Sequence, residues 1–241
     1  MKQYGLIGFP LKNSFSANYF NQKFTAEGID AHYQNFSIET IEEFPSMIAQ
    51  QPNLCGLNVT IPYKQQVIPF LDKLDDTAAK IGAVNTIKFE HNKLIGYNTD
   101  AYGFEKSILP LLKVWHQNAL VLGTGGASKA ILYALHRLGI KYTQVSRNPD
   151  AGLLYEELDK GLIRSHQIII NCTPLGMFPY VEQAPPIPYA YMTNLHLAFD
   201  LIYLPSETLF LQQCKTQGAV TQNGLSMLHF QANKAWEIWN K

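Results

Sequence analysis

Val121-Leu122-Gly123-Thr124-Gly125-Gly126-Ala127-Ser128 is the stretch of this 241-residue chain that decides its fold. An apolar strand is expected to run into this glycine-rich turn, and a helix to begin directly after it. The order matches the dinucleotide-binding fingerprint, with Ser128 in the third small position. Gly123 permits the tight turn, while Gly125 and Gly126 let a pyrophosphate approach the backbone. The helix N-terminus then offers N–H groups to the phosphates, so the turn predicts a dinucleotide site.

The sequence on both sides of the turn predicts an α/β fold. Alternating strands and helices indicate a parallel sheet covered by helices on both faces, a Rossmann-type doubly wound domain. Its strands are expected at 119–122, 143–146, 167–172, 197–202 and 219–221. The first hundred residues are mixed α/β, with a β-hairpin around His91-Asn92. Further helices are expected over 62–71 and 153–162.

Two domains follow from this pattern. A mixed α/β substrate domain comprises residues 1–100 and is completed by the amphipathic last helix in 225–241. A Rossmann-like cofactor domain comprises residues 101–224. We expect the active site in a cleft between them.

Composition excludes several other classes of protein. The chain has 19 Lys+Arg and 19 Asp+Glu, and this zero net charge argues against a general nucleic-acid binder. No apolar run approaches the roughly 20 residues that span a bilayer, and the first residues do not resemble a signal peptide. Three separated cysteines and seven scattered histidines suit neither a disulfide framework nor a metal site. We therefore expect a cytoplasmic protein without a bound metal.

The segment after the second Rossmann strand indicates which dinucleotide binds. An NAD site carries an acid here for the ribose 2′-hydroxyl, but the sequence reads Val145-Ser146-Arg147-Asn148. Arg147 can pair with a 2′-phosphate, which favours NADP. Asp150 lies close enough in the sequence to keep NAD open.

Three polar stretches in the first domain carry groups suited to proton transfer. They are Gly56-Leu57-Asn58-Val59-Thr60-Ile61-Pro62-Tyr63-Lys64, Gly82-Ala83-Val84-Asn85-Thr86 and Tyr97-Asn98-Thr99-Asp100. Taken singly, Lys64 is typical of a solvated helix residue, Asp100 of an N-cap and Asn85 of a turn amide. Beside a dinucleotide fold, Lys64 and Asp100 supply a pair for carbonyl reduction, in which a lysine protonates the developing alkoxide.

The order of these motifs resembles the shikimate dehydrogenase family, within the wider shikimate/quinate dehydrogenase group. The resemblance covers essentially the whole chain. It also includes Ser14-Phe15-Ser16, Asn171-Cys172-Thr173-Pro174-Leu175-Gly176-Met177, Asp200-Leu201-Ile202-Tyr203-Leu204-Pro205 with Thr208, and Gly224-Leu225-Ser226-Met227-Leu228 with Gln231. The chain departs from the family's pattern at three places. Ala17 stands where the family often has proline, and Ser226 where it often has glycine. The segment between Arg147 and Asn171 is short, which implies a trimmed cofactor domain.

The resemblance implies reversible NADPH-dependent reduction of 3-dehydroshikimate to shikimate in chorismate and aromatic amino-acid biosynthesis. Lys64 and Asp100 would be the catalytic residues. The implied substrate-binding residues are Ser14, Ser16 and Tyr203 on the carboxylate, with Asn58, Thr60, Asn85 and Gln231 beside the ring. The implied cofactor-binding residues are Gly123, Gly125, Gly126, Ala127, Ser128, Ser146, Arg147, Thr173, Gly224 and Met227.

Two alternatives stay open. Quinate carries an extra hydroxyl at C1 beside its carboxylate, so Ser14, Ser16 and Tyr203 would decide whether the chain is an NAD-tolerant quinate/shikimate dehydrogenase. A non-catalytic dinucleotide-binding regulator is expected to lack the Lys/Asp pair, and both Lys64 and Asp100 are present. We expect a small-molecule substrate, neither nucleic acid nor membrane as a partner, and a monomer or homodimer.

Overall fold

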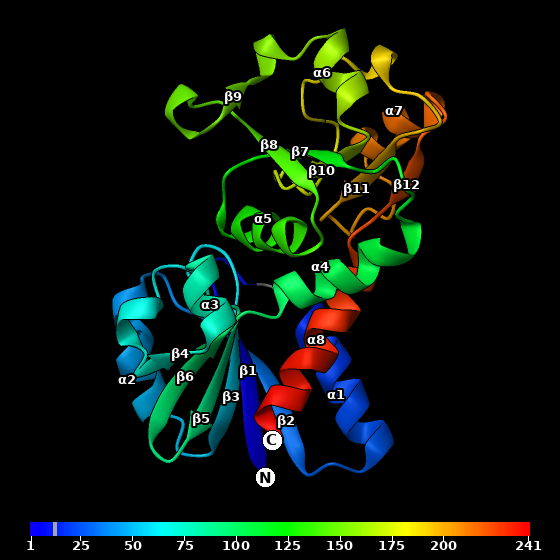
Figure 1. Cartoon of the computed structure of the whole chain (residues 1–241). Helices are drawn as coiled ribbons and strands as arrows, with labels where there is room; N and C mark the ends of the chain where they lie inside the picture. The colour runs from blue at the N-terminus through cyan, green and yellow to red at the C-terminus, as the bar shows by residue number, and fades with distance from the viewer. Residues whose placement is uncertain (12–13) are drawn as a thin grey trace. The chain divides into compact units, whose positions relative to one another are not determined.

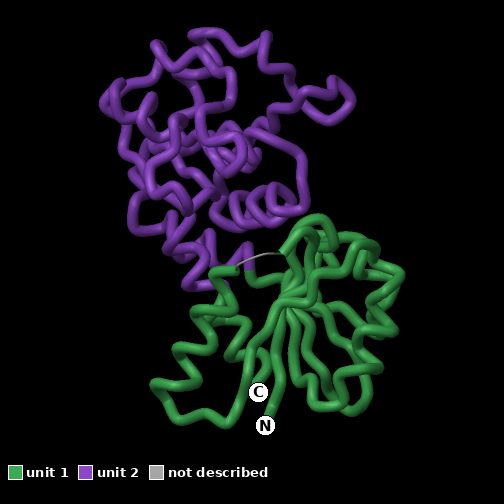
Figure 2. Tube along the Cα trace, turned by 180° about the vertical axis from the view of Figure 1, so that it is seen from behind, with its two compact units in different colours: residues 1–99, 232–241 green, residues 100–231 purple. Residues whose placement is uncertain are grey.

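The computed structural model describes residues 1–11 and 14–241 and separates into two compact units. Unit 1 consists of Met1–Thr99 and Ala232–Lys241, and unit 2 of Asp100–Gln231 (Figure 2). The units divide the last helix at Ala232, whereas the sequence-based division placed all of 225–241, and Asp100, in the first domain.

Unit 1 is built on a six-stranded mixed sheet with the order β2-β1-β3-β5-β6-β4 (Figure 1). The first three strands in this order run parallel, and β5 runs antiparallel to β3. The predicted hairpin is confirmed: β5 and β6 are antiparallel and joined by His91 and Asn92, both at positive φ. The strands are β1 (Lys2–Gly8), β2 (Ala31–Ser37), β3 (Leu54–Val59), β4 (Lys73–Leu74), β5 (Thr86–Glu90) and β6 (Lys93–Tyr97).

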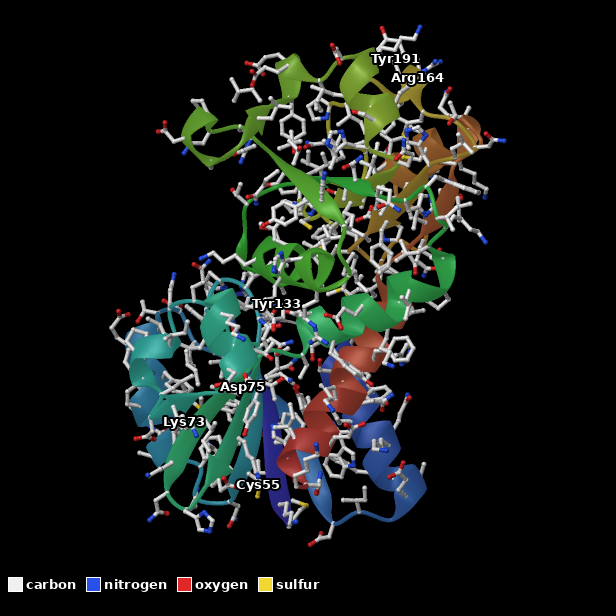
Figure 3. The ribbon with its side chains drawn as sticks, in the orientation of Figure 1. Cys55, Lys73, Asp75, Tyr133, Arg164 and Tyr191 are labelled. Carbon is white, nitrogen blue, oxygen red and sulfur yellow. The ribbon has the colours of Figure 1, made fainter. Side chains whose placement is uncertain are left out.

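Helices cover both faces of this sheet (Figure 1). On one face, α1 (Phe15–Glu27) and the end of α8 (Leu225–Trp239) bury an aromatic cluster that includes Tyr4, Phe20 and Trp239. On the other face lie α2 (Phe44–Ala49) and α3 (Asp76–Ile81). Asp75 starts α3 by accepting the Ala78 N–H at 2.8 Å (Figure 3).

Two expected helices are largely absent. Residues 61–67 form turns, followed by a 3₁₀ helix at Ile68–Phe70. Pro69 lacks an N–H, so it cannot donate the α-helical hydrogen bond to the carbonyl of Gln65. Instead of a helix over 153–162, Leu153–Leu154 form β9, which pairs with β8. A helix begins only at Lys160.

Unit 2 contains an all-parallel six-stranded sheet with the order β12-β11-β10-β7-β8-β9. Read from β9, this is the 3-2-1-4-5-6 order of a doubly wound dinucleotide fold, with its switch point between β7 and β10. The strands are β7 (Asn118–Leu122), β8 (Lys141–Ser146), β9 (Leu153–Leu154), β10 (Ile168–Asn171), β11 (Leu197–Asp200) and β12 (Val220–Gln222).

The helices of unit 2 are α4 (Asp100–Ile108), α5 (Gly126–Arg137), α6 (Lys160–Ser165), α7 (Leu209–Thr216) and the first half of α8. Phe104 of α4 packs edge-on against Phe199 of β11, with ring centroids 5.0 Å apart. Ile163 of α6 and Phe210 of α7 lie in a separate cluster with Leu120 and Ala198. Helices therefore cover both faces of the sheet. Within the described ranges, no helix combines the length and apolarity needed to cross a membrane.

Candidate active site

Ser14 lies at the N-terminus of α1, where its side chain does two things. Its Oγ accepts the Ala17 N–H at 3.0 Å, which caps the helix. The same hydroxyl donates to Oδ1 of Asn35 on β2 at 2.7 Å. The expected carboxylate ligand Ser14 therefore stands at a helix end that favours anions, and a strand side chain orients it.

The Tyr33 hydroxyl connects Ser16 with Asn58. Tyr33 donates to Asn58 Oδ1 at 2.8 Å and is hydrogen-bonded to Ser16. Burial raises the pKa of Tyr33 well above its ordinary value, although the Ser16 bond acts in the opposite direction. The phenol is thus a neutral donor that brings two expected substrate-binding residues together.

Partners within unit 1 occupy most of the hydrogen-bonding positions of the Asn58 side chain. Its Nδ2 donates to the Asn85 carbonyl and to Thr86 Oγ1, each at 3.2 Å. Both N–H groups are then engaged, and one lone pair of Oδ1 is taken by Tyr33. Asn58 Oδ1 retains one lone pair, so its geometry suits acceptance of a hydrogen bond from a ring hydroxyl.

Backbone contacts join the lysine and asparagine segments. The Val84 N–H donates to the Lys64 carbonyl at 2.7 Å, directly before Asn85. The Thr60 N–H donates to the Ile7 carbonyl at 2.9 Å, at the carboxyl ends of β1 and β3. Unit 1 therefore gathers Ser14, Ser16, Asn58, Thr60, Lys64 and Asn85 around its parallel strand ends. Asp100, only 2% exposed, begins α4 in unit 2, and its pairing with Lys64 stays a prediction.

The glycine-rich turn lies at the switch point of the unit 2 sheet. Gly123 has φ 103°, which favours glycine, and a Cβ there would lie 3.2 Å from Thr173 Cγ2. The turn after β7 and the loop after β10 are therefore adjacent. Gly125 precedes α5 in extended backbone, and a Cβ there would meet nothing within 4 Å. This open space above a helix N-terminus fits a dinucleotide pyrophosphate.

Two serines of the expected cofactor set hold the local backbone. Ser128 Oγ is buried and donates to the Gly125 carbonyl at 2.7 Å. Ser146 Oγ accepts the Asn148 N–H at 3.0 Å, just after β8. Gln144, which belongs to none of the sequence motifs, donates to the Gly123 carbonyl at 2.9 Å. These contacts shape the turn, while contact of either serine with a cofactor stays a prediction.

Arg147 is exposed directly after β8, at the strand end beside the glycine-rich turn. The Arg147 charge is close enough to act on the Tyr155 phenol. The pKa of Tyr155 is raised to about 12, because the effect of its burial outweighs that of the Arg147 charge, which lowers it. A guanidinium can pair with a 2′-phosphate, and this contact of Arg147 stays a prediction.

Asp200 joins the ends of β10 and β11. Its Oδ1 accepts from Asn171 Nδ2 at 3.1 Å and from the Ile202 N–H at 3.0 Å, and its Oδ2 accepts from Thr208 Oγ1 at 2.6 Å. The pKa of this carboxyl is raised to about 6, because the effect of burial outweighs that of the three hydrogen bonds, which lower it. Asp200 fixes the loop that carries Tyr203, a role that was not expected from the sequence.

Close backbone approaches set the start of α8. A Cβ on Gly224 would lie 2.1 Å from the Leu201 carbonyl oxygen, so only glycine fits there. A Cβ on Gly103 of α4 would lie 2.6 Å from the Met227 carbonyl oxygen and 3.2 Å from Gln231. The helix that begins at Asp100 is therefore packed closely against the α8 segment carrying Met227 and Gln231.

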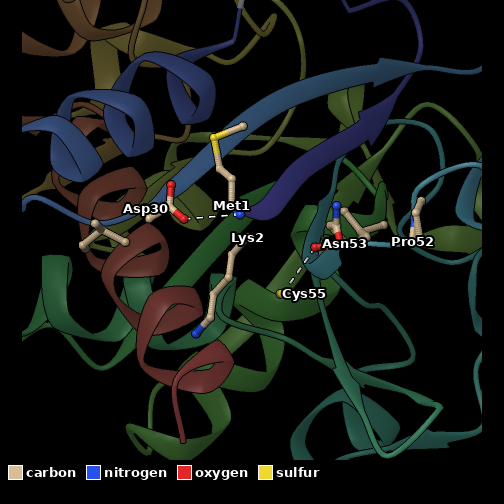
Figure 4. Close-up of a pocket in the computed structure, with 8 residues that line it drawn as sticks. Met1, Lys2, Asp30, Pro52, Asn53 and Cys55 are labelled. Carbon is tan, nitrogen blue, oxygen red and sulfur yellow. Dashed lines mark hydrogen bonds and ion pairs between the residues drawn. The ribbon is translucent and has the colours of Figure 1, made fainter.

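The hollow shown in Figure 4 lies elsewhere in unit 1. It is lined by Met1, Lys2, Asp30 and Asn53 among others, where β1 and β3 begin. It contains none of the expected site residues. Among residues 1–11 and 14–241, no cluster of three or more His, Cys, Asp or Glu is placed to hold a metal ion.

The sequence of this chain is similar to those of known proteins. Residues 6–87 match the family model for the shikimate dehydrogenase substrate binding domain. The NADP(+) shikimate dehydrogenase of Carboxydothermus hydrogenoformans is 40% identical, over an alignment that covers 98% of this chain and 90% of that protein.

Two solved structures extend the match. Thermus thermophilus shikimate 5-dehydrogenase, in complex with NADP(H) and shikimate, matches with TM-score 0.89 and 30% identity over 99% of this chain and 93% of that one. A Listeria monocytogenes shikimate 5-dehydrogenase in complex with shikimate and NAD matches with TM-score 0.86 and 27% identity, over 99% and 91%. With relatives of such identity spanning nearly its whole length, the chain belongs to the shikimate dehydrogenase family.

Proposed function

We infer that this chain is an NADP-dependent shikimate dehydrogenase that reversibly reduces 3-dehydroshikimate to shikimate. The observation that carries the inference is the near full-length match to a relative solved with NADP(H) and shikimate. Every residue expected to act on either ligand is present in the chain. The small-molecule substrate follows from this reaction, whereas the monomer or homodimer state and the cytoplasmic location are further proposals.

In the proposed reduction, bound NADPH supplies a hydride to the carbonyl carbon at C3. Lys64 donates a proton from its ammonium Nζ to the carbonyl oxygen, so that a hydroxyl forms. The Asp100 carboxylate accepts a hydrogen bond from the substrate hydroxyl and stabilises the ammonium form of Lys64. In the reverse direction, Lys64 takes the hydroxyl proton back.

Binding of the substrate is assigned to groups at the strand ends. Ser14, Ser16 and Tyr203 would hold the carboxylate, the first at the N-terminus of α1. Asn85 and Gln231 would bind ring hydroxyls by donating or accepting, whereas Asn58 would accept. Thr60 completes this set.

The cofactor would lie on the turn of unit 2. The open space at Gly125 and the N-terminus of α5 suit the pyrophosphate. Arg147 would hold the 2′-phosphate, and Thr173, Gly224 and Met227 would line the nicotinamide side. The remaining expected contacts, Gly123, Gly126, Ala127, Ser128 and Ser146, are part of the same turn and the neighbouring strand end.

One observation supports NAD tolerance as a second candidate: the Listeria monocytogenes relative was solved with NAD. The absence of an acid directly after β8 and the exposure of Arg147 favour NADP instead.

The test is the reduction itself. Purified chain, NADPH and 3-dehydroshikimate should consume NADPH and yield shikimate identified by mass spectrometry. Lys64→Ala should lose roughly 100-fold or more of kcat while its Kd for NADPH changes less than about threefold. The exposed Lys160→Ala on α6 is the matched control. No shikimate from the wild-type chain would reject the function, and full activity of Lys64→Ala would reject the role of Lys64.

A further inference from the structure

Alternate side chains of β2 hold the segment that carries the two serines. Residues two apart in a strand project from the same face of the sheet. Tyr33, Asn35 and Ser37 follow this spacing and lie on the face covered by α1. Their partners are Ser16 for Tyr33, Ser14 for Asn35, and the Leu11 N–H for Ser37 Oγ at 3.2 Å. One face of β2 thus contacts both serine side chains and sets the direction of the Ser14 hydroxyl.

The hydrogen bonds of Ser14 conflict with its expected role. A serine hydroxyl has one proton to donate and two lone pairs. That proton goes to Asn35 Oδ1 at 2.7 Å, and one lone pair accepts the Ala17 N–H at 3.0 Å. A carboxylate only accepts hydrogen bonds. Ser14 can therefore bind a carboxylate only after its proton turns away from Asn35.

We propose that Asn35 is a specificity-determining residue, whose side-chain amide sets the direction in which Ser14 donates and thereby selects a substrate with a free carboxylate. The proposal rests on the proposed function, because it places the substrate carboxylate at Ser14.

The amide of Asn35 can follow the Ser14 proton by turning over. Rotation of about 180° about χ2 exchanges Oδ1 and Nδ2, which have nearly the same size, and this torsion is roughly two-fold. Asn35 Nδ2 then donates to the second lone pair of Ser14 Oγ, and Ser14 donates to the substrate. The contact between Ser14 Oγ and the Asn35 amide is kept in both arrangements, and donation from the amide strengthens Ser14 as a donor.

Aspartate at position 35 removes this second arrangement. An ionised aspartate has no N–H, so it can only accept the Ser14 proton. It also places a negative charge beside the expected substrate carboxylate. Leucine, similar in size, has neither donor nor acceptor and leaves the Ser14 proton free to turn.

The first test compares Asn35→Asp with Asn35→Leu on shikimate and on its methyl ester, which is neutral. Asn35→Asp should raise KM for shikimate about tenfold or more, with a much smaller effect on the ester and on the KM for NADP+. Asn35→Leu should raise KM for shikimate about two- to fivefold with kcat nearly unchanged. If Asn35→Asp affects the acid and the ester equally, the charge at position 35 does not sense the carboxylate and the proposal is wrong.

A second test asks whether Asn35 acts through Ser14. Asn35→Leu should raise KM for shikimate in the wild-type chain and leave it unchanged when Ser14 is already alanine. An equal effect in both backgrounds would overturn the proposal. Thermal unfolding of each variant separates a loss of fold from a change in KM. Failure of the wild-type chain to oxidise shikimate would instead reject the proposed function, so the two failures are distinguishable.

Discussion

Asn85 and Thr99 hold each other through reciprocal hydrogen bonds: the Thr99 N–H donates to Asn85 Oδ1 at 2.7 Å, and Asn85 Nδ2 donates to Thr99 Oγ1 at 3.0 Å. Both side chains are buried. Thr99 directly precedes Asp100, so this pair fixes the backbone from which α4 begins. Asn85 therefore has a structural task besides the substrate contact that we propose for it.

Replacement of Asn85 tests this double task. Asn85→Ala leaves the buried Thr99 N–H without its side-chain acceptor, which should lower the free energy of unfolding by about 1–3 kcal/mol and also reduce kcat/KM for shikimate. Thr99→Val keeps the N–H bond to Asn85 and should cost less in both measurements. Urea unfolding and steady-state kinetics check this, and equal losses in the two variants would contradict it.

Two glycines should separate cofactor binding from folding. Gly125→Ala fills open space at a permitted φ, so the Tm should change by only about 1 °C, while the Kd for NADP+ rises about tenfold or more. Gly224→Ala puts a methyl group against the Leu201 carbonyl oxygen, so its Tm should fall by several degrees. Calorimetry of unfolding and of NADP+ binding measures both. Undiminished NADP+ affinity in Gly125→Ala would place the cofactor elsewhere.

Arg147 should determine the choice of cofactor. Without its guanidinium the 2′-phosphate loses a charge-assisted hydrogen bond, so Arg147→Ala should reduce the ratio of kcat/KM for NADP+ to that for NAD+ about tenfold. Arg164, an exposed arginine on α6, is the matched control and its alanine variant should keep the wild-type ratio (Figure 3). An unchanged ratio in Arg147→Ala would contradict the assignment.

The buried Asp200 carboxyl should make stability depend on pH. Because burial raises its pKa from 3.8 to about 6, the folded chain binds this proton more tightly than the unfolded chain does. The resulting stabilisation is complete below pH 3.8 and is lost as the pH rises through about 6. Between pH 4 and 7, the free energy of unfolding of wild type should therefore fall relative to Asp200→Asn, by on the order of 2 kcal/mol.

Urea unfolding at several pH values measures this dependence. Thr208→Ser retains the hydroxyl that donates to Asp200 and should keep the wild-type slope. Identical slopes for wild type and Asp200→Asn would show that Asp200 does not carry this linkage.

The sequence predicts the fold well where local signals agree. The glycine-rich turn and the alternation after it are found as β7, α5 and the parallel sheet, and the His91-Asn92 hairpin is found as predicted. The prediction of a helix over 62–71 was wrong. Pro62 favours the first turn of a helix, but Pro69 lacks the N–H that the interior of a helix needs. Such errors arise where one residue breaks an otherwise periodic pattern.

The candidate site was only partly accessible from sequence. Lys64, Asp100 and Arg147 carry charges whose positions in motifs suggest chemistry. Asn35 and Tyr33 act through contacts with residues about 20 positions away, and a strand of mixed polarity gives no signal for such contacts. Asp200 belonged to a recognised motif, yet its role became visible only when Asn171 and Thr208 were found bonded to it.

The most direct measurement of the proposed activity is kcat/KM for shikimate and for quinate, each with NADP+ and with NAD+. We expect shikimate with NADP+ to exceed each of the other three combinations by about tenfold or more. Comparable values for quinate, or a preference for NAD+, would contradict the claim that this chain is an NADP-dependent shikimate dehydrogenase.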